Sequence, residues 1–346
     1  MRAALPNVAL FYAIKSLPHA AMIRTLRDLG SGFDIASSGE ASLIKEHSIY
    51  PKQVIHTHPI KSDREITKAI RTGCTTFVID NVYELKKFIA YKHRVGLLLR
   101  IAFRSADASV DLSKKFGCNV DDAQAIVLEA QALGITVKGV SFHVGSQTHS
   151  ADKHVEAIGF CDTFMQTMNR EYKTQLHILN IGGGFPVNYI RPEEDTIDTF
   201  CQPIRKALSA LPDSVQVFAE PGRYLSAPAV TVVCSVNGIS KRGDVMWYYL
   251  NDGVYGAFSG QLFDHARYPL SIYSDSSDYQ PSVLAGPTCD SIDVIADDIE
   301  LPSLEMGDVV VGRMMGAYTL ATSTTFNSLP CADFRVINVN EVDDEL

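Results

Sequence analysis

The sequence has no apolar run approaching the roughly 18 residues needed to cross a membrane, and no secretory signal precedes its first apolar segment. Its seven cysteines are dispersed and form no C-x-x-C pair. This pattern is typical of reduced thiols rather than of a disulfide framework. These absences predict a soluble, cytoplasmic protein.

The chain also lacks an excess of positive charge. It has 31 basic and 40 acidic residues and a net charge of −9, which argues against nucleic acid or an anionic membrane as a partner. The same balance does not oppose a small cationic substrate. At 346 residues and 46% apolar content, the chain is long enough for a barrel and a second domain.

Short apolar segments alternate with helical patterns from the N-terminus to about Leu225. Strands are expected at Val8–Lys15, Gly32–Ala36, Val54–His58, Thr76–Ile79, Val95–Ile101, Val137–Val144, Ile178–Ile181 and Val217–Glu220. Helices are expected near 19–29, 38–47, 62–72, 82–91, 120–133, 152–170 and 194–210, and Ser62 and Glu65 have capping-box spacing. Strands separated by helices predict an α/β fold, a parallel (β/α)8 TIM-like barrel, over residues 1–225.

After Leu225 the pattern becomes mostly β. Strands are expected at Thr231–Ser235, Val245–Leu250, Ser282–Ala285, Asp290–Ile295, Val309–Val311 and Phe334–Val339, without long helices between them. We therefore expect residues 226–346 to form a separate C-terminal domain resembling a β-sandwich or a barrel. The acidic tail from Glu341 to Leu346 is expected to be frayed.

Lys15 ends the first apolar run, Val8-Ala-Leu-Phe-Tyr-Ala-Ile-Lys15. A lysine that is partly removed from water has a lowered pKa, and the neutral amine is the form that attacks an aldehyde. Most lysines at strand ends are solvated and inactive, so Lys15 by itself is a weak indicator. The later motifs strengthen it.

Two glycine-containing turns follow the seventh and eighth expected strands. They are Ile181-Gly-Gly-Gly-Phe-Pro186 and Glu220-Pro-Gly-Arg-Tyr224. The loops after these strands are where a barrel most readily binds phosphate. Glycines admit backbone N–H groups to an anion, and Arg223 adds a bidentate cation. A simple tight turn is the alternative for the glycines alone.

Glu220 ends an apolar strand, where a carboxylate is costly unless it is paired. It could form a structural ion pair with Arg223 or another barrel arginine, or it could bind the ring nitrogen of pyridoxal phosphate (PLP) and keep that ring protonated. His143 and Ser146 end the sixth strand; the imidazole could stack on a flat cofactor or be a core histidine.

Three further groups have weaker signals. His56 and His58 share a strand face, but no carboxylate or thiol has matching metal-ligand spacing, so we interpret them as structural and predict no metal site. Cys289 and Asp290 lie side by side in a turn, where a thiol could donate a proton or could be inert. The turns around Asp252 and Asp264 are polar and could lack any catalytic role.

Taken in order, these motifs resemble the alanine-racemase-fold (type III) PLP-dependent decarboxylases, and closely the ornithine/lysine branch. The resemblance covers nearly the whole chain. It is carried by Phe-Tyr-Ala-Ile-Lys15, Gly32-Phe-Asp34-Ile-Ala-Ser37, His143-Val-Gly-Ser146, Ile181-Gly-Gly-Gly-Phe-Pro186, Glu220-Pro-Gly-Arg223-Tyr224, Asn251-Asp-Gly-Val-Tyr-Gly256, Gly286-Pro-Thr-Cys289-Asp290 and Met315-Gly-Ala-Tyr318.

The resemblance implies a role for each matching residue. Lys15 would hold PLP covalently, His143 would lie against its ring, and Glu220 would face the ring nitrogen. The expected phosphate ligands are Ser146, Gly183, Gly184, Gly222, Arg223 and Tyr318, and residues expected to support the lysine are Asp34, Glu40 and Arg100.

The resemblance also implies a homodimer in which each site is built from both subunits. Cys289 would reach the partner's barrel and return a proton to the substrate after carbon dioxide leaves. Asp264 and Asp290 would bind the distal ammonium of a basic amino acid, with Phe263 in the substrate wall. Residues 112–117 resemble the family's mobile loop, which would close over the site.

The implied activity is decarboxylation of ornithine, and possibly of lysine, to putrescine or cadaverine in polyamine biosynthesis. One methylene separates the two substrates, and a pocket discriminates that by only ~1–3 kcal/mol. Racemases of this fold carry arginine where Glu220 stands, so the glutamate favours decarboxylation. Alternatives are a diaminopimelate or carboxynorspermidine decarboxylase, or a non-catalytic regulatory homologue.

The chain departs from the family pattern in two places. Phe263 stands where family members commonly have tyrosine, which removes a hydroxyl from the substrate wall. The chain begins about one turn before its first strand, whereas the family normally has a helix there and a strand that joins the β-domain. We expect either a truncated sequence or a β-domain with an exposed edge.

Overall fold

The computed structural model describes residues 1–103, 108–110, 112–191, 194 and 197–337. The chain divides into two compact units, Met1–Leu225 and Ser226–Leu346, and each is described by itself. Within the described residues, no helix is long and apolar enough to span a membrane.

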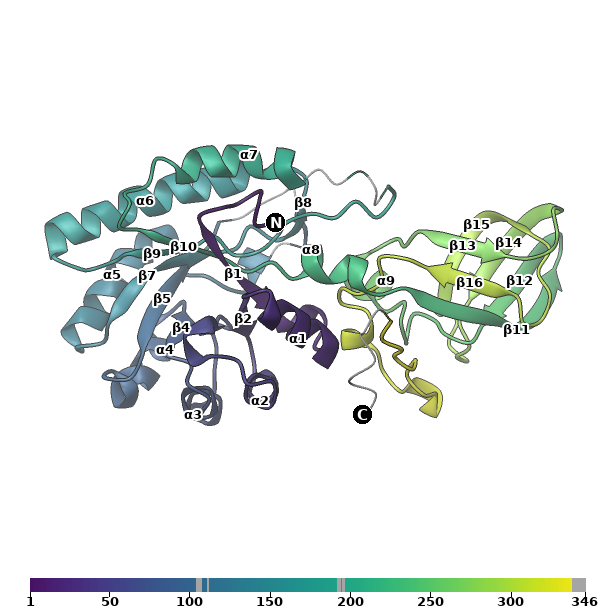
Figure 1. The fold of residues 1–346 in the computed structure, drawn as a ribbon, viewed down its shortest axis with the longest axis horizontal. Helices are drawn as coiled ribbons and strands as arrows, with labels where there is room; N and C mark the ends of the chain where they lie inside the picture. The colour runs from purple at the N-terminus through teal and green to yellow at the C-terminus, as the bar shows by residue number, and fades with distance from the viewer. Residues whose placement is uncertain (104–107, 111, 192–193, 195–196, 338–346) are drawn as a thin grey trace. The chain divides into compact units, whose positions relative to one another are not determined.

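The first unit is a closed parallel barrel (Figure 1). Its strands are β1 (Val8–Ala13), β2 (Gly32–Ile35), β3 (Val54–His56), β4 (Thr76–Ile79), β5 (Gly96–Ile101), β7 (Val137–Phe142), β9 (Ile178–Asn180) and β10 (Gln216–Ala219). The order around the barrel is β1-β10-β9-β7-β5-β4-β3-β2, so the first and last strands close it. The predicted (β/α)8 barrel is therefore confirmed.

Helices lie outside the barrel strands in Figure 1. They are α1 (Ala20–Asp28), α2 (Ser38–Glu46), α3 (Asp63–Arg71), α4 (Val82–Lys87), α5 (Val120–Ala132), α6 (Asp152–Tyr172) and α7 (Ile197–Leu208), followed by the short α8 (Arg223–Ser226). Side-chain caps fix several starts. The capping box expected from Ser62 and Glu65 is present at α3, and Asn81 caps α4 by accepting from the Glu84 N–H.

Two details of the first unit differ from the sequence-based expectation. The first strand ends at Ala13, and Lys15 lies in a 3₁₀ turn, Ile14–Ser16. In addition, β6 (Ala108–Val110) pairs with β8 (Ser146–Thr148) in a two-stranded antiparallel sheet that was not predicted. Three residues per strand give too little alternation to be recognised.

The second unit contains a six-stranded sheet, in the order β13-β16-β11-β12-β14-β15. Its strands are β11 (Val232–Arg242), β12 (Val245–Leu250), β13 (Leu270–Tyr273), β14 (Tyr279–Ala285), β15 (Val294–Pro302) and β16 (Val309–Gly312). Only the β12–β14 pair among these is parallel. The prediction that the second domain is mostly β is thus confirmed.

Two of the strands expected there are wrong. Residues 290–293 form a turn, and the strand expected at Asp290–Ile295 begins only at Val294. The buried carboxylate of Asp293 explains this, because it accepts hydrogen bonds from the N–H groups of Val254 and Thr288 and so holds a turn. Residues 334–337 form no strand, whereas residues 338–339 and the acidic tail lie outside the described part of the chain.

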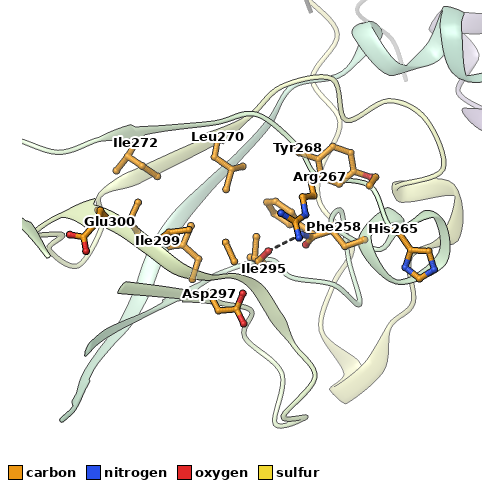
Figure 2. A pocket seen from close by; sticks show the side chains of 15 residues that line it. Phe258, His265, Arg267, Tyr268, Leu270, Ile272, Ile295, Asp297, Ile299 and Glu300 are labelled. Carbon is orange, nitrogen blue, oxygen red and sulfur yellow. Dashed lines mark hydrogen bonds between the residues drawn. The ribbon is translucent and has the colours of Figure 1, made fainter. Parts of the chain in front are cut away.

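A cavity of about 650 Å³ lies within the second unit. Figure 2 shows Leu270 and Ile272 of β13 and Ile295 and Ile299 of β15 around it. Among the described strands, β13 and β15 are each paired on one side only. Both outer strands of the sheet therefore line the same cavity, whose wall also includes the charged Arg267, Asp297 and Glu300.

Candidate active site

The carboxyl ends of β1 and β10 bring Lys15 and Glu220 to the same end of the barrel. The two strands are parallel neighbours in which Leu10 is paired with Ala219, and the Ala13 N–H donates to the carbonyl of Pro221 at 3.2 Å. Each functional side chain follows its strand within two residues. They lie close enough for the Lys15 charge to lower the pKa of Glu220 against other influences.

Asp34 is the charged partner of Lys15. The Lys15 Nζ and Asp34 Oδ2 atoms are 3.5 Å apart, and the lysine side chain is 45% exposed while the aspartate is buried. The Thr57 hydroxyl donates to the other carboxylate oxygen at 2.5 Å. Burial raises the pKa of Asp34, and the nearby Lys15 opposes that rise. The Lys15 amine is therefore held beside Asp34, although the lysine side chain as a whole stays half-exposed.

Glu220 is half-buried and lies beside the fully buried Asn180, whose Nδ2 donates to Oε1 at 2.6 Å. Burial raises the pKa of Glu220 to about 7, and the Asp34 charge adds to that effect, whereas Lys15 and Arg100 oppose it. Near neutral pH, the Glu220 carboxyl can therefore be protonated or ionised. The Arg100 guanidinium beside it has one buried nitrogen, Nη2, without a hydrogen-bond partner among the described residues.

The raised pKa of Glu220 predicts a pH effect on the cofactor-free protein. A carboxyl whose pKa is raised on folding stabilises the fold fully below its ordinary pKa, and that contribution is lost as the pH rises through about 7. The melting temperature of the wild type relative to Glu220→Gln should therefore fall by several degrees between pH 5 and pH 8. For the control variant Glu171→Gln, at an exposed position, the difference in melting temperature from the wild type should not change with pH. The same constant difference for Glu220→Gln would contradict the prediction.

His143 directly follows β7 and is held as a neutral ring. Its Nδ1 accepts from the Gly145 N–H at 3.0 Å. Burial lowers its pKa well below the ordinary value, and the charges of Arg100 and Lys15 lower it further. A Cβ built on Gly183 would lie 3.1 Å from His143 Nε2 and 2.8 Å from the Glu220 carbonyl oxygen. The imidazole, the glycine turn and Glu220 are therefore neighbours.

The turn at 182–184 requires glycine. Gly182 and Gly184 have φ values of +67° and +93°. A Cβ on Gly184 would lie 2.5 Å from the Gly145 carbonyl oxygen. From α6, the His154 Nε2 lies 3.1 Å from the Gly183 carbonyl oxygen, which holds the middle of the turn.

Arg223 forms the cationic part of the site. Its side chain is only 6% exposed; Nη2 and Nε donate to Ser146 Oγ at 3.1 and 3.3 Å, and Nη1 donates to the Tyr189 hydroxyl at 2.9 Å. The preceding residue, Gly222, packs closely against the turn that carries Lys15, because a Cβ there would lie 3.3 Å from Ala13 and Ser16. A buried guanidinium beside a glycine turn is suited to binding an anion.

These residues fit pyridoxal phosphate. Each part of that cofactor has a matching group: the Lys15 amine can bond its aldehyde, and the Glu220 carboxylate can face its ring nitrogen. The neutral, flat His143 ring can lie against the pyridine ring, and the buried Arg223 guanidinium beside the glycine turn can bind the phosphate. Among the described residues, the buried Arg100 Nη2 has no hydrogen-bond partner, which leaves a donor that the cofactor or the substrate could engage.

The second unit holds the remaining predicted residues. Cys289 is exposed and is contacted by Asn327, while Asp290 accepts from the Tyr255 hydroxyl at 2.6 Å. Phe263 and Asp264 end the short helix α9 (Gly260–Asp264), and Phe263 is 59% exposed. Tyr318 has a φ of +54°, and its carbonyl accepts from the Thr322 hydroxyl.

Other predicted residues have different neighbours. His56 stacks on Phe77, whereas the ring of His58 meets Phe116 edge-on, so the two imidazoles contact different aromatic rings. No group of three potential metal ligands occurs in the described part of the chain. Gly117 donates its N–H to Asp80 at 2.9 Å, and the expected mobility of residues 112–117 stays a prediction.

Sequence comparison identifies the family. Residues 1–227 match the model of the pyridoxal-binding domain of the pyridoxal-dependent decarboxylases. The chain belongs to this family. It is a carboxy-lyase of that class, and its cofactor is pyridoxal phosphate.

Individual members of the family are similar over most of the chain. The lysine/ornithine decarboxylase of Selenomonas ruminantium is 37% identical over 94% of this chain and 83% of its own length. Antizyme inhibitor 2 of Xenopus laevis is 36% identical over 94% of this chain and 74% of its own. A solved lysine/ornithine decarboxylase from Vibrio vulnificus, complexed with cadaverine, is 50% identical with a TM-score of 0.91, covering 96% and 86% of the two chains.

Sequence reasoning missed several residues that complete these sites. Glu220 is contacted by Asn180. Arg223 is contacted by Tyr189, and Cys289 by Asn327. Only Asn180 carried a signal, because an amide in a three-residue buried strand just before a glycine turn needs a hydrogen-bond partner.

Proposed function

We propose that this chain decarboxylates basic amino acids with a terminal ammonium, ornithine and lysine, to putrescine and cadaverine. The observation that carries the proposal is the meeting of Lys15 and Glu220 at one barrel end, where Arg223, which follows β10, also bonds Ser146, which follows β7. The names of the Selenomonas and Vibrio relatives support the same substrates.

The barrel residues, and Tyr318 of the second unit, would bind and orient the cofactor. Lys15 would bond its aldehyde carbon, with Asp34 holding the amine, and His143 would present a neutral ring to its face. Arg223, Ser146 and Tyr318 would bind its phosphate, together with the backbone at Gly183, Gly184 and Gly222. When bound, pyridoxal phosphate supplies an electron-accepting ring conjugated to the substrate α-carbon.

Other residues would control protons and charge. Glu220 would keep a proton at the ring nitrogen, which strengthens the ring as an electron acceptor, and Arg100 would balance the buried carboxylates. Cys289 would give its thiol proton to the α-carbon after carbon dioxide leaves. Asp264 and Asp290 would bind the distal ammonium, and the Tyr255 hydroxyl keeps the pKa of Asp290 below its ordinary value.

We also propose that the enzyme is a cytoplasmic homodimer. Cys289 is exposed in the second unit, so a second copy could take this turn into its barrel and complete a shared site. Sedimentation measurements would test the dimer. Mixing a Lys15 variant with a Cys289 variant would test sharing, since mixed dimers should regain activity.

Product analysis tests the proposed reaction. With ornithine or lysine as substrate, the purified enzyme should release one molecule of carbon dioxide for each molecule of diamine formed. Inactivity with ornithine, lysine and arginine, together with turnover of diaminopimelate or carboxynorspermidine, would overturn the choice of substrate.

The similarity to antizyme inhibitor 2 makes a non-catalytic regulator the second candidate. The presence of Lys15, Glu220 and Cys289 in this chain favours the enzyme. A purified enzyme should be yellow, with a visible band that borohydride abolishes. A colourless protein that takes up no pyridoxal phosphate would favour the regulator.

Arg223→Ala should weaken binding of pyridoxal phosphate by roughly 10- to 100-fold, because it removes a charge-assisted hydrogen-bond donor from the anion. Absorbance titration of the cofactor-free protein measures this directly. Arg191→Ala is a suitable control, since Arg191 is exposed and pairs with Glu194. Equal affinities of the two variants would contradict the phosphate role of Arg223.

A further inference from the structure

Asn327 makes two hydrogen bonds to Cys289 from 38 residues further along the chain. Its Oδ1 accepts from the Cys289 backbone N–H at 3.0 Å. Its Nδ2 donates to the Cys289 Sγ at 3.4 Å. One amide side chain therefore fixes both the main chain and the sulfur of the same residue.

The local backbone is arranged to present this side chain. Asn327 has a φ of +56° and a ψ of +16°, a left-handed conformation that asparagine tolerates better than most residues. The following residue, Ser328, also has a positive φ. Such a conformation is retained when surrounding contacts stabilise it, and the two bonds to Cys289 are such contacts.

The neighbouring residues attach the same segment to the other member of the Cys289–Asp290 turn. The Phe326 ring stacks on Tyr255, with centroids 4.6 Å apart and planes 25° apart, and Thr324 donates its N–H to the Tyr255 carbonyl at 2.8 Å. The Tyr255 hydroxyl in turn donates to Asp290. Residues 324–327 thus contact Cys289 directly and Asp290 through Tyr255.

We propose that Asn327 is the positioning residue of Cys289, holding its main chain and directing its sulfur as the proton donor of the reaction. This inference rests on the proposed function, in which the thiol proton moves to the substrate α-carbon. That step breaks the S–H bond and leaves a negative sulfur. The amide N–H directed at the sulfur stabilises this charge, because hydrogen bonding to a charged form favours it.

Two variants separate the parts of this role. Asn327→Asp keeps an oxygen for the Cys289 N–H but replaces the N–H donor with a negatively charged acceptor. Asn327→Gly keeps the left-handed backbone and removes both bonds. Asn237→Asp is the matched control, because it makes the same change at an exposed position on β11.

The first readout is the pH profile of Cys289 alkylation by iodoacetamide in the holoenzyme, followed by mass spectrometry. A Cys331→Ser background removes the other exposed thiol. Asn327→Asp should raise the midpoint of this profile by about one pH unit, and Asn327→Gly should raise it less. Asn237→Asp should leave it unchanged. A midpoint unaltered in Asn327→Asp would overturn the proposal.

The second readout is a double-mutant cycle on turnover of ornithine or lysine. Asn327→Asp should lower kcat on the order of ten-fold with little change in KM, since a misdirected general acid affects the chemical step. In a Cys289→Ala background the same substitution should have no further effect. An equal loss of kcat in both backgrounds would overturn the proposal.

The two readouts also distinguish the failure of this inference from failure of the proposed function. If Cys289→Ala retains full turnover, Cys289 is not the proton donor and the proposed mechanism is wrong. The alkylation profile would still decide whether Asn327 controls the sulfur.

Discussion

Lys15→Ala should remove the covalent attachment of pyridoxal phosphate and lower kcat by a factor on the order of 10²–10⁴, the range for loss of a residue that both bonds and exchanges protons. The reason is geometric. Lys15 follows β1 beside the end of β10, and Asp34 holds its amine 3.5 Å away. Borohydride reduction followed by peptide mapping should place the cofactor on the Lys15 peptide in the wild type and on no peptide in the variant.

Lys61 is the lysine that makes this experiment decisive. Lys61 is also a lysine of the barrel unit; it is buried and lies between β3 and α3. Its Nζ, however, donates to the carbonyls of His58, Pro59 and Val78, and it pairs with Glu84 at 3.2 Å. Burial lowers the pKa of Lys61 to about 8, yet its three N–H donors are all used within the protein. We therefore expect no cofactor on Lys61. Label there, or in Lys15→Ala, would contradict the assignment.

A control lysine checks that the loss is specific. Lys45→Ala changes an exposed residue of α2 and should keep the visible band and the turnover of the wild type. Circular dichroism should show both variants folded. If the exposed substitution abolished the band as well, the effect of Lys15→Ala would reflect general destabilisation.

The barrel could be predicted because most of its strands are largely buried. Strands such as β5 (Gly96–Ile101) are short runs that are apolar apart from Arg100, and such runs bounded by helical patterns can be recognised without knowing their partners. The catalytic candidates followed, since residues after parallel strands gather at one barrel end. Lys15, His143 and Glu220 were found in this way.

The residues that support the site could not be predicted in the same way. Tyr189 contacts Arg223 across 34 positions, and Asn327 contacts Cys289 across 38. Neither has a local pattern, because the partner is chosen by the tertiary fold. The wrong strand at Asp290–Ile295 has a related cause. Ile292 and Val294 alternate with polar residues as in a strand, but the contacts of Asp293 hold a turn there.

Glu220→Gln should lower kcat by a factor on the order of 10²–10³, the range found when one preorganised electrostatic group is removed. Glutamine has nearly the same shape, and its oxygen can still accept from Asn180, so the packing around residue 220 should persist. What it lacks is the negative charge that keeps a proton on the cofactor ring nitrogen. Affinity for pyridoxal phosphate should change less than turnover, because Lys15 and Arg223 hold other parts of the cofactor.

Two comparisons show that the charge is what matters. Glu220→Arg places a cation where the ring proton must be retained, so it should lower kcat further than Glu220→Gln does. Glu171→Gln makes the matched neutral change at an exposed pair with Arg170 and should leave kcat unaltered. If Glu220→Gln kept wild-type turnover while its cofactor spectrum was unchanged, the carboxylate would be a structural partner of Asn180 and Arg100, and the ring proton would need another source.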